Sequence, residues 1–353
     1  MTTIGDVARH AGVATSTVSY VLSGKRATSP ATRERVRRAI AELGYRPHAG
    51  ARALASARTQ VLALMVPLRL DAGGRGPRSD LDLDVVMQFV AGVAPRARSL
   101  GYDVLLLTDD DPTAVGRVSV SSSADALIVM DVEVDDARIP AVVAAGTPTV
   151  LIGLPDEQSG LSCVDFDFEQ AGRLAVRHLA RLGHRVLAFV GPPPAALRRR
   201  TSYAERMLRG LRAQAASSEV ELRIAPATAS RDDVVHAIAE ALDTESGATA
   251  LVVHNEAALP IVLDVLAERG VRVPADVSVI AVGVSGVAEQ RVGVLTSIDI
   301  PGRAIGAVAA EMVVAALGGA VRAETRLVRA NLTDRGTTAR PPARRRPTSQ
   351  ENS

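Results

Sequence analysis

The 353-residue chain is predicted to fold as an all-α helix-turn-helix head followed by an α/β body of two doubly wound lobes. Three observations predict this architecture. Apolar residues recur at helical spacing on both sides of Gly12. Residues 61–340 alternate apolar runs with amphipathic stretches, which is typical of parallel sheets covered by helices. The head and the body also carry net charges of opposite sign.

Two short helices are predicted for the start of the chain, over residues 4–11 and 15–22. Gly12 suits the tight turn between them, because glycine adopts a positive φ at little cost. Both helices are able to bury one face through Ile4, Val7, Ala8, Ala11, Val13, Val18, Val21 and Leu22. The outward side chains of the second helix, suited to base edges in a major groove, are Thr15, Ser16, Ser19 and Tyr20. Spacing alone also allows a helical hairpin with a solvated face.

The charge distribution favours the DNA-binding alternative. Residues 1–60 contain ten Lys and Arg against three Asp and Glu, a net charge of +7. Residues 61–339 contain 27 against 35, a net charge of −8, and residues 340–353 contain four against one. A basic head on an acidic body is typical of a molecule that contacts phosphates with one end. A membrane-surface role is disfavoured, since the head lacks a wide apolar face flanked by aromatic residues.

A third helix and a shorter helical segment are predicted to extend the head. Ser29 and Pro30 have the sequence of an N-cap and first helical residue, and the helix should run to about Leu43 before Gly44. Residues 49–56 are rich in alanine, with Leu54 as the one large apolar residue. Such a short helix is marginal in isolation, so this segment is either a helix that forms on docking to a partner or a linker.

These segments, TIGDVARHAGVATSTVSYVLSG and SPATRERVRRAIAELGYRPHAGARALAS, together resemble the head of the LacI/GalR family of bacterial transcription regulators. The resemblance includes the Tyr-x-Pro link and the A-R-x-L-A signature of a hinge helix, and it extends to Thr338. It implies a two-lobed, periplasmic-binding-protein-like regulatory domain. It also implies a transcriptional regulator, more specifically a repressor, that binds a palindromic double-stranded DNA operator as a homodimer or tetramer. A small ligand between the lobes would change its affinity for DNA.

The family also implies roles for individual residues of the head. Thr15, Ser16 and Tyr20 lie where recognition-helix side chains meet bases, and Leu54 lies where a leucine wedges into the minor groove. The positions expected near phosphates are Arg26, Arg33, Arg46 and Arg52.

The head departs from the family pattern at two positions. Ala14 stands where a capping serine is common, which costs on the order of 1 kcal/mol unless Thr15 takes over the cap. Tyr20 stands where many members have arginine, and tyrosine cannot make the bidentate contact to guanine. The operator half-site should therefore differ there from the commonest ones.

The chain is expected to divide into four parts: a helix-turn-helix domain at 1–47, a hinge helix and linker at 48–60, a two-lobed effector-binding and dimerisation domain at 61–338, and a basic tail at 339–353. Residues from Gly336 onward show no apolar periodicity, which predicts disorder. The strands expected in the lobes are 61–66, 103–107, 126–130, 148–152, 186–190, 251–254 and 277–282. The expected helices are 85–100, 170–182, 203–215, 232–242, 257–269 and 302–317. Crossings between the lobes are expected near Ser159–Ser162 and Leu295.

Ligands of open α/β sheets bind at the carboxyl ends of the strands, which selects loop residues as an effector site. The loop segments selected in this way are 165–167, 198–200 and 254–256. The individual residues expected to contact the effector are Leu68, Asp71, Asp131, Asp167, Arg200, Arg206, Asn255 and Ser285. Each is also explained as a solvated loop residue. The sequence Gly283-Val284-Ser285-Gly286 lacks the carboxylate that the family often has there, and the chain has no Trp and few other aromatic residues. Since sugar sites commonly include aromatic rings, the effector is a sugar, another metabolite, or absent.

Other functional classes are disfavoured. The chain has no G-x-G-x-x-G or P-loop signature, and its six histidines show no metal-ligand spacing, so neither an enzyme nor a cofactor is expected. Cys163 is the only cysteine, which excludes an internal disulfide. A periplasmic solute-binding protein would begin with a signal peptide, but the N-terminus is the basic head. No apolar run approaches about 20 residues, so the protein is expected in the bacterial cytoplasm, associated with the nucleoid and not with a membrane.

Overall fold

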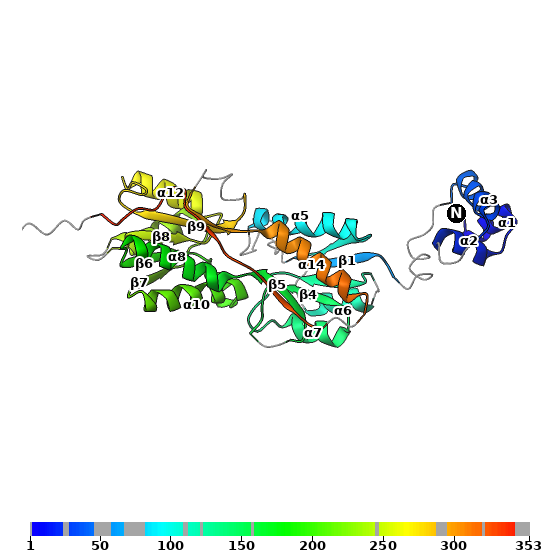
Figure 1. The fold of residues 1–353 in the computed structure, drawn as a ribbon, viewed down its shortest axis with the longest axis horizontal. Coiled ribbons are helices and arrows are strands. Elements are labelled where there is room, and N and C mark those ends of the chain that lie inside the picture. The colour runs from blue at the N-terminus through cyan, green and yellow to red at the C-terminus, as the bar shows by residue number, and fades with distance from the viewer. Residues whose placement is uncertain are drawn as a thin grey trace, which may run out of the picture.

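The computed structural model describes residues 2–23, 28–45, 58–66, 82–108, 112–120, 123–156, 159–243, 247–286, 295–319 and 322–342. The head consists of α1 (Ile4–Ala11), α2 (Thr15–Ser23) and α3 (Pro30–Glu42), and it stands apart from the two lobes in Figure 1. These helices enclose a small core that includes Val7, Val18, Val36 and Tyr45. The helix-turn-helix predicted from apolar spacing is confirmed.

Capping side chains set the boundaries of the head helices. Thr3 and Asp6 form a capping box at the start of α1, which was not predicted from the sequence. Gly12 ends α1 with φ 61°, as predicted for the turn. The Ser29 hydroxyl accepts a hydrogen bond from the Thr32 backbone N–H at 3.2 Å, so Ser29 caps α3 as predicted. Short polar side chains therefore define where these helices begin.

The body contains two six-stranded sheets, which define lobe 1 and lobe 2. The sheet of lobe 1 has the order β11-β5-β4-β3-β1-β2, and all its strand pairs are parallel. Its strands are β1 (Val61–Met65), β2 (Asp103–Leu107), β3 (Ala126–Val129), β4 (Thr149–Ile152), β5 (Ser162–Phe166) and β11 (Thr325–Val328). The sheet of lobe 2 has the order β12-β10-β9-β8-β6-β7, with only β12 antiparallel. Its strands are β6 (Val186–Val190), β7 (Glu221–Ala225), β8 (Ala250–Val253), β9 (Ser278–Val284), β10 (Ser297–Ile300) and β12 (Leu332–Thr333).

Helices cover both sheets, and glycines let some of them approach closely. Those of lobe 1 are α5 (Leu83–Ser99), α6 (Pro112–Val120), α7 (Arg138–Ala145) and α14 (Gly302–Ala316). Those of lobe 2 are α8 (Phe168–Leu182), α9 (Pro194–Arg198), α10 (Ser202–Ser217), α11 (Arg231–Leu242) and α12 (Leu259–Glu268). Helices α5 and α14 lie side by side (Figure 1). A Cβ at Gly92 would lie 2.1 Å from the Arg303 carbonyl oxygen, so only glycine permits this approach.

The chain crosses between the lobes at three places: at Asp167 between β5 and α8, at Pro301 between β10 and α14, and at residues 329–331 between β11 and β12. The crossings predicted near Ser159–Ser162 and Leu295 were wrong. Ser159–Ser162 leads into β5, which still pairs with β4 in lobe 1. Leu295 precedes β10, which pairs with β9 in lobe 2. In both cases one further short strand completes the sheet before the chain leaves it.

The disorder predicted from Gly336 onward was wrong for residues 336–342. The Thr337 hydroxyl donates to the Val279 carbonyl at 2.8 Å, and the Val279 N–H donates to the Thr337 carbonyl at 2.8 Å. The Ala339 N–H donates to the Ser278 hydroxyl at 3.0 Å, and the Ala339 carbonyl lies 2.9 Å from His184 Nε2. Polar and backbone groups hold this segment, so apolar periodicity gave no sign of it. Residues 343–353 lie outside the described residues.

Candidate DNA-binding head and interlobe cleft

Helix α2 presents polar side chains outward while its apolar side packs into the head. Val18 is fully buried in the core with α1 and α3. Thr15 and Ser16 are exposed, and Ser19 and Tyr20 are partly buried. Such an arrangement leaves small hydroxyl side chains available to base edges. Of the residues predicted to contact phosphates, Arg33 is exposed on α3, whereas Arg26, Arg46, Arg52 and the predicted wedge Leu54 lie outside the described residues.

The helices of the head are also joined by a polar contact. His10 Nε2 on α1 lies 2.6 Å from a Glu42 carboxylate oxygen at the end of α3. Both side chains are about half exposed, so the contact adds little stability in water. The packing of α1 against α3 therefore depends mainly on the small apolar core.

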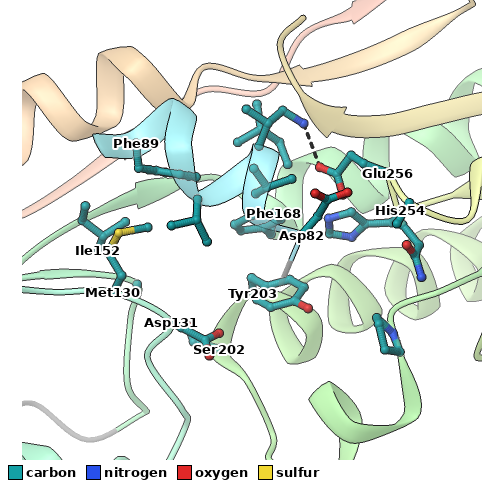
Figure 2. Close-up of a pocket in the computed structure, with 18 of the residues that line it drawn as sticks. Asp82, Phe89, Met130, Asp131, Ile152, Phe168, Ser202, Tyr203, His254 and Glu256 are labelled. Carbon is teal, nitrogen blue, oxygen red and sulfur yellow. Dashed lines mark hydrogen bonds between the residues drawn. The ribbon is translucent and has the colours of Figure 1, made fainter. Parts of the chain in front are cut away.

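A cavity of about 1060 Å³ lies between the lobes, at the carboxyl ends of strands from both sheets. Lobe 1 contributes the start of α5 and the residues after β3 and β4, and lobe 2 contributes α8, α10 and the residues after β8. Figure 2 shows side chains from both lobes converging on this space. The cleft expected from the carboxyl-end rule is present.

Aromatic side chains gather in this cavity. The Phe168 and His254 rings stack with centroids 5.7 Å apart, and Tyr203 meets His254 edge-on at 5.6 Å. Phe89 of α5 lines the opposite side, in lobe 1 (Figure 2). The low aromatic content of the whole chain argued against a sugar site. It does not describe the cavity, because the fold brings half of the body's six Phe and Tyr residues there.

His254 is neutral at the centre of this aromatic cluster. The residue is 6% exposed, and burial lowers the pKa of its imidazole to about 4. Its Nδ1 atom has no hydrogen-bond partner among the described residues. A buried, uncharged ring that stacks on Phe168 serves as part of an apolar wall.

A carboxylate does lie at the end of β9, although residues 283–286 supply none. Glu256, which follows β8, accepts a hydrogen bond from the Val284 N–H at 2.9 Å (Figure 2). A Cβ at Gly283 would lie 2.8 Å from the Glu256 Cγ, so glycine leaves room for this side chain. The loop after β8 thus brings a carboxylate to the end of β9, which sequence order alone did not reveal.

Residues 131–135 of lobe 1 and 199–202 of lobe 2 meet along one wall of the cavity, and we call these two segments the interlobe seam. Arg199 donates from Nη2 to Asp131 at 2.6 Å and from Nε to Glu133 at 2.7 Å. Burial acts to lower the pKa of Arg199, but Asp131 and Glu133 outweigh it and raise that pKa. The Ser202 N–H donates to the Val132 carbonyl at 2.8 Å, and the Val134 N–H donates to the Arg200 carbonyl at 2.9 Å.

A second ion pair crosses between the lobes behind the cavity. Arg206 Nη1 lies 2.6 Å from Asp165 Oδ2, and both side chains are less than a tenth exposed. Burial raises the pKa of Asp165 to about 6, against the opposing charge of Arg206. Asp165 lines the cavity, whereas Arg206 lies with Asp167 in a smaller neighbouring pocket.

The structure brings only some of the predicted effector residues together. Asp131 and Asn255 line the cavity, but the Asn255 amide is engaged with the Ala227 carbonyl and the Ala258 N–H. Asp167, Arg200, Arg206 and Ser285 are not among the described lining residues. Each has another contact: Asp167 caps α8, Arg200 pairs with Asp135, Arg206 pairs with Asp165, and Ser285 donates to the Ile300 carbonyl. Leu68 and Asp71 lie outside the described residues. Four lining residues were not predicted individually from the sequence, Phe89, Phe168, Tyr203 and Arg199, although Arg199 falls within the predicted segment 198–200.

Comparisons with known proteins agree with this architecture. Residues 3–48 match the family of bacterial regulatory proteins named for LacI, and residues 176–338 match a periplasmic binding protein-like domain. The HTH-type transcriptional regulator CelR of Thermobifida fusca is 32% identical over 92% of this chain and 95% of its own. Catabolite control protein A of Priestia megaterium is 27% identical over 87% and 90% of the two chains.

Solved structures of relatives with a similar whole-chain architecture agree. The Lac repressor dimer bound to operator and the anti-inducer ONPF has a TM-score of 0.79 and 26% identity, covering 96% of this chain and 99% of that one. The complex of CelR with cellobiose has a TM-score of 0.65 and 27% identity, covering 96% and 100%. No described helix is long and apolar enough to cross a membrane. The chain belongs to the LacI family of bacterial regulatory proteins and is a DNA-binding transcriptional regulator.

Proposed function

We propose that this regulator is a repressor that binds a palindromic operator as a homodimer and is controlled by a small molecule in the interlobe cavity. The observation that carries the proposal is the cavity itself, which both lobes line with aromatic and carboxylate side chains. A ligand that contacts both lobes binds one arrangement of them better than another, and it thereby shifts the affinity for DNA. The exposed hydroxyl face of α2 supplies the contact with bases.

The effector that fits this cavity best is a mono- or disaccharide-sized polyhydroxyl compound. Phe168 and Tyr203 offer ring faces, and Asp131 and Glu256 offer carboxylates that accept hydrogen bonds from hydroxyl groups. The relative CelR has been solved with cellobiose, which makes β-linked disaccharides the first compounds to test. Calorimetric titration with such a panel should give one saturable binder, and Tyr203→Phe should bind it within a few fold while Tyr203→Ala loses about tenfold. A panel with no binder and no effect on operator affinity would favour a regulator without a small-molecule effector.

Exposed apolar side chains at the edge of lobe 1 support the dimer. Met87 on α5 is 45% exposed, and Leu106 and Leu105, which point to opposite faces of the edge strand β2, are 43% and 38% exposed. A second copy of the chain is the proposed occupant, since the related Lac repressor was solved as a dimer. Sedimentation should give a dimer, and Leu105→Glu with Leu106→Glu should convert it to a monomer. A parent protein that sediments as a monomer would contradict the dimer.

Selection of genomic DNA fragments by the purified protein tests the operator. Palindromic sites should be enriched, and Tyr20→Ala should change the base preference at one position in each half-site. Arg33→Ala should weaken binding to all sequences alike, because it loses a phosphate contact. The slope of the logarithm of the binding constant against the logarithm of the salt concentration should become shallower by about one. Enrichment without any palindromic preference would contradict the proposal.

The hinge position Leu54, which lies outside the described residues, gives a separate test. Its proposed role is to wedge into the minor groove of the specific site. Leu54→Ala should therefore weaken operator binding much more than binding to unrelated DNA. Equal losses on both DNAs would refute the wedge.

A further inference from the structure

The interlobe seam joins the two lobes through both backbone and side-chain contacts, at a distance in sequence from the three crossing segments. Glu133 and Thr201 form an isolated antiparallel bridge. Two further backbone hydrogen bonds flank it, between Ser202 and Val132 and between Val134 and Arg200. The Ser202 hydroxyl also accepts a hydrogen bond from the Leu154 N–H at 3.1 Å. The lobes are thus fastened to each other without any ligand contact.

Arg199 is the side chain that neutralises charge in the seam. The Asp131 side chain is 1% exposed and that of Arg199 is 16% exposed. Without Arg199, closure of the lobes would bury an uncompensated carboxylate, which is strongly unfavourable. The adjacent Arg200 also pairs across the lobes, with Asp135, but those side chains are 51% and 70% exposed. Solvent screens that second pair, so it contributes little to closure.

The closed seam also carries costs that opening would relieve. Asp131 and Arg200 both adopt φ 53°, a left-handed backbone conformation that is unfavourable for most side chains. Asp131 Oδ1 and Thr201 Oγ1 are buried without hydrogen-bond partners among the described residues, although water satisfies such atoms in an open arrangement. These costs act against the Arg199 ion pairs in the closed arrangement.

We propose that Arg199 is a positioning residue that latches the lobes in the operator-binding arrangement, through Asp131 and Glu133, before any effector is bound. The inference rests on the proposed function for its link to the operator. The whole chain, head and lobes together, is more similar to the operator-bound Lac repressor than to the CelR–cellobiose complex, and the operator measurement below tests the link for the lobes. An effector in the cavity then acts by displacing Asp131 or Arg199 from this pairing.

The distance between the lobes tests the latch without DNA or effector. Exposed sites for spin labels are Val143 on α7 of lobe 1 and Val235 on α11 of lobe 2, each changed to cysteine. Burial raises the pKa of the native Cys163 to about 11, so that thiol does not compete for the label. Labelled chains are diluted with unlabelled ones so that only distances within a chain are recorded.

Arg199→Gln should shift or broaden the distance distribution by several ångströms, whereas Arg200→Gln, its matched neighbour, should leave it unchanged. Asp131→Asn tolerates the same backbone conformation and should shift the distribution in the same direction. The double variant Arg199→Gln with Asp131→Asn should shift the distribution little more than either single variant, because both substitutions remove the same interaction. Arg199→Lys keeps one of the two ion pairs and should restore part of the parental distribution.

An unchanged distribution in Arg199→Gln, in a protein with the parental unfolding midpoint, overturns the latch.

Operator affinity then tests the coupling. Arg199→Gln should bind the selected operator about tenfold more weakly than the parent, and Arg200→Gln within about twofold. Opening of the lobes without loss of operator affinity overturns the regulatory half of the proposal. If the parent selects no operator, the proposed function fails, while the distance measurement still decides whether Arg199 latches the lobes.

Discussion

The head and the interlobe cleft differ in how their surfaces are assembled. The surface of the head that we propose contacts DNA comes from one helix of nine residues, α2, whose outward side chains are close in sequence. The cavity is lined by residues between Asp82 and Ile300, taken from the ends of separate elements in two lobes. The residues of a surface formed by one helix can be predicted from the periodicity of that helix. The residues of a surface assembled from distant segments cannot, because the fold decides which charged side chains pair with one another. Four predictions test this difference, beginning with the largest expected effect.

A charge in the core of the head should remove DNA binding and leave the body intact. Val36 is fully buried against α1 and α2, so Val36→Asp should unfold the head and weaken operator binding by at least about 100-fold. Fluorescence anisotropy measures the binding, and calorimetry should show an unchanged transition for the body. Ala31→Asp, at an exposed site on the same helix, is the control. Operator binding that survives Val36→Asp would show that the head is not the DNA-binding unit.

His254 should make the stability of the body depend on pH. Its pKa is about 4 in the folded chain against 6.5 as the ordinary value, so the unfolded chain binds the proton first as pH falls. The stability is fully present above pH 6.5 and is lost as pH falls towards 4, by about 3 kcal/mol. His254→Phe keeps a ring against Phe168 and should flatten this part of the unfolding profile. His236→Gln, at an exposed helix position, should not flatten it. Equal slopes for His254→Phe and the parent would contradict the role of burial.

The ordered end of the chain should stabilise lobe 2. A chain that ends at Gly336 loses the contacts of Thr337 and Ala339 with β9 and with His184. After the entropy of ordering these residues is offset, the loss should be about 2 kcal/mol. Denaturant unfolding measures it, and a chain that ends at Pro342 serves as the control with parental stability. A parental midpoint for both truncated chains would show that the segment adds nothing.

The smallest expected effect is at the cap of α3. Ser29→Ala removes the acceptor for the Thr32 N–H and should destabilise the head by about 1 kcal/mol. Hydrogen exchange of the α3 amides detects such a change, while amides of lobe 2 should not respond. Ser29→Asp keeps an acceptor and adds a favourable charge at the helix N-terminus, so it should exchange as slowly as the parent. Faster exchange in both variants would argue against capping as the cause.

Most elements of the body were predictable because they are long or strongly apolar. All the strands and helices predicted there lie within about two residues of those observed. Most of the strands not predicted are short or partly exposed: β7 has one buried residue of five, and β12 spans only Leu332–Thr333. The strand β5 is an exception, since four of its five residues are buried. The pairing of β7 and β12 depends on the sheet beside them and not on their own periodicity. The same reason explains the segment 336–342, in which Thr337 and Ala339 form hydrogen bonds with β9, with Thr296 before β10 and with His184 before β6.

The cleft was predicted at the right edge of the sheets but with only part of its residues. Asp131 was selected because it follows a strand, and it does line the cavity. Its pairing with Arg199, and that of Arg206 with Asp165, joins residues 68 and 41 positions apart. No spacing rule connects such residues, because the lobe-to-lobe contact brings them together.

The sequence by itself determined the three-helix head, the two α/β lobes and the family, because these follow from apolar periodicity, capping residues and a dense local motif. Tertiary structure alone decided where the chain crosses between the lobes and which charges neutralise each other across the cleft. It also decided that a chain poor in aromatic residues places Phe89, Phe168 and Tyr203 around one cavity. Periodicity is a property of neighbouring residues. The composition of a cavity is a property of strand ends that meet only after both sheets have formed.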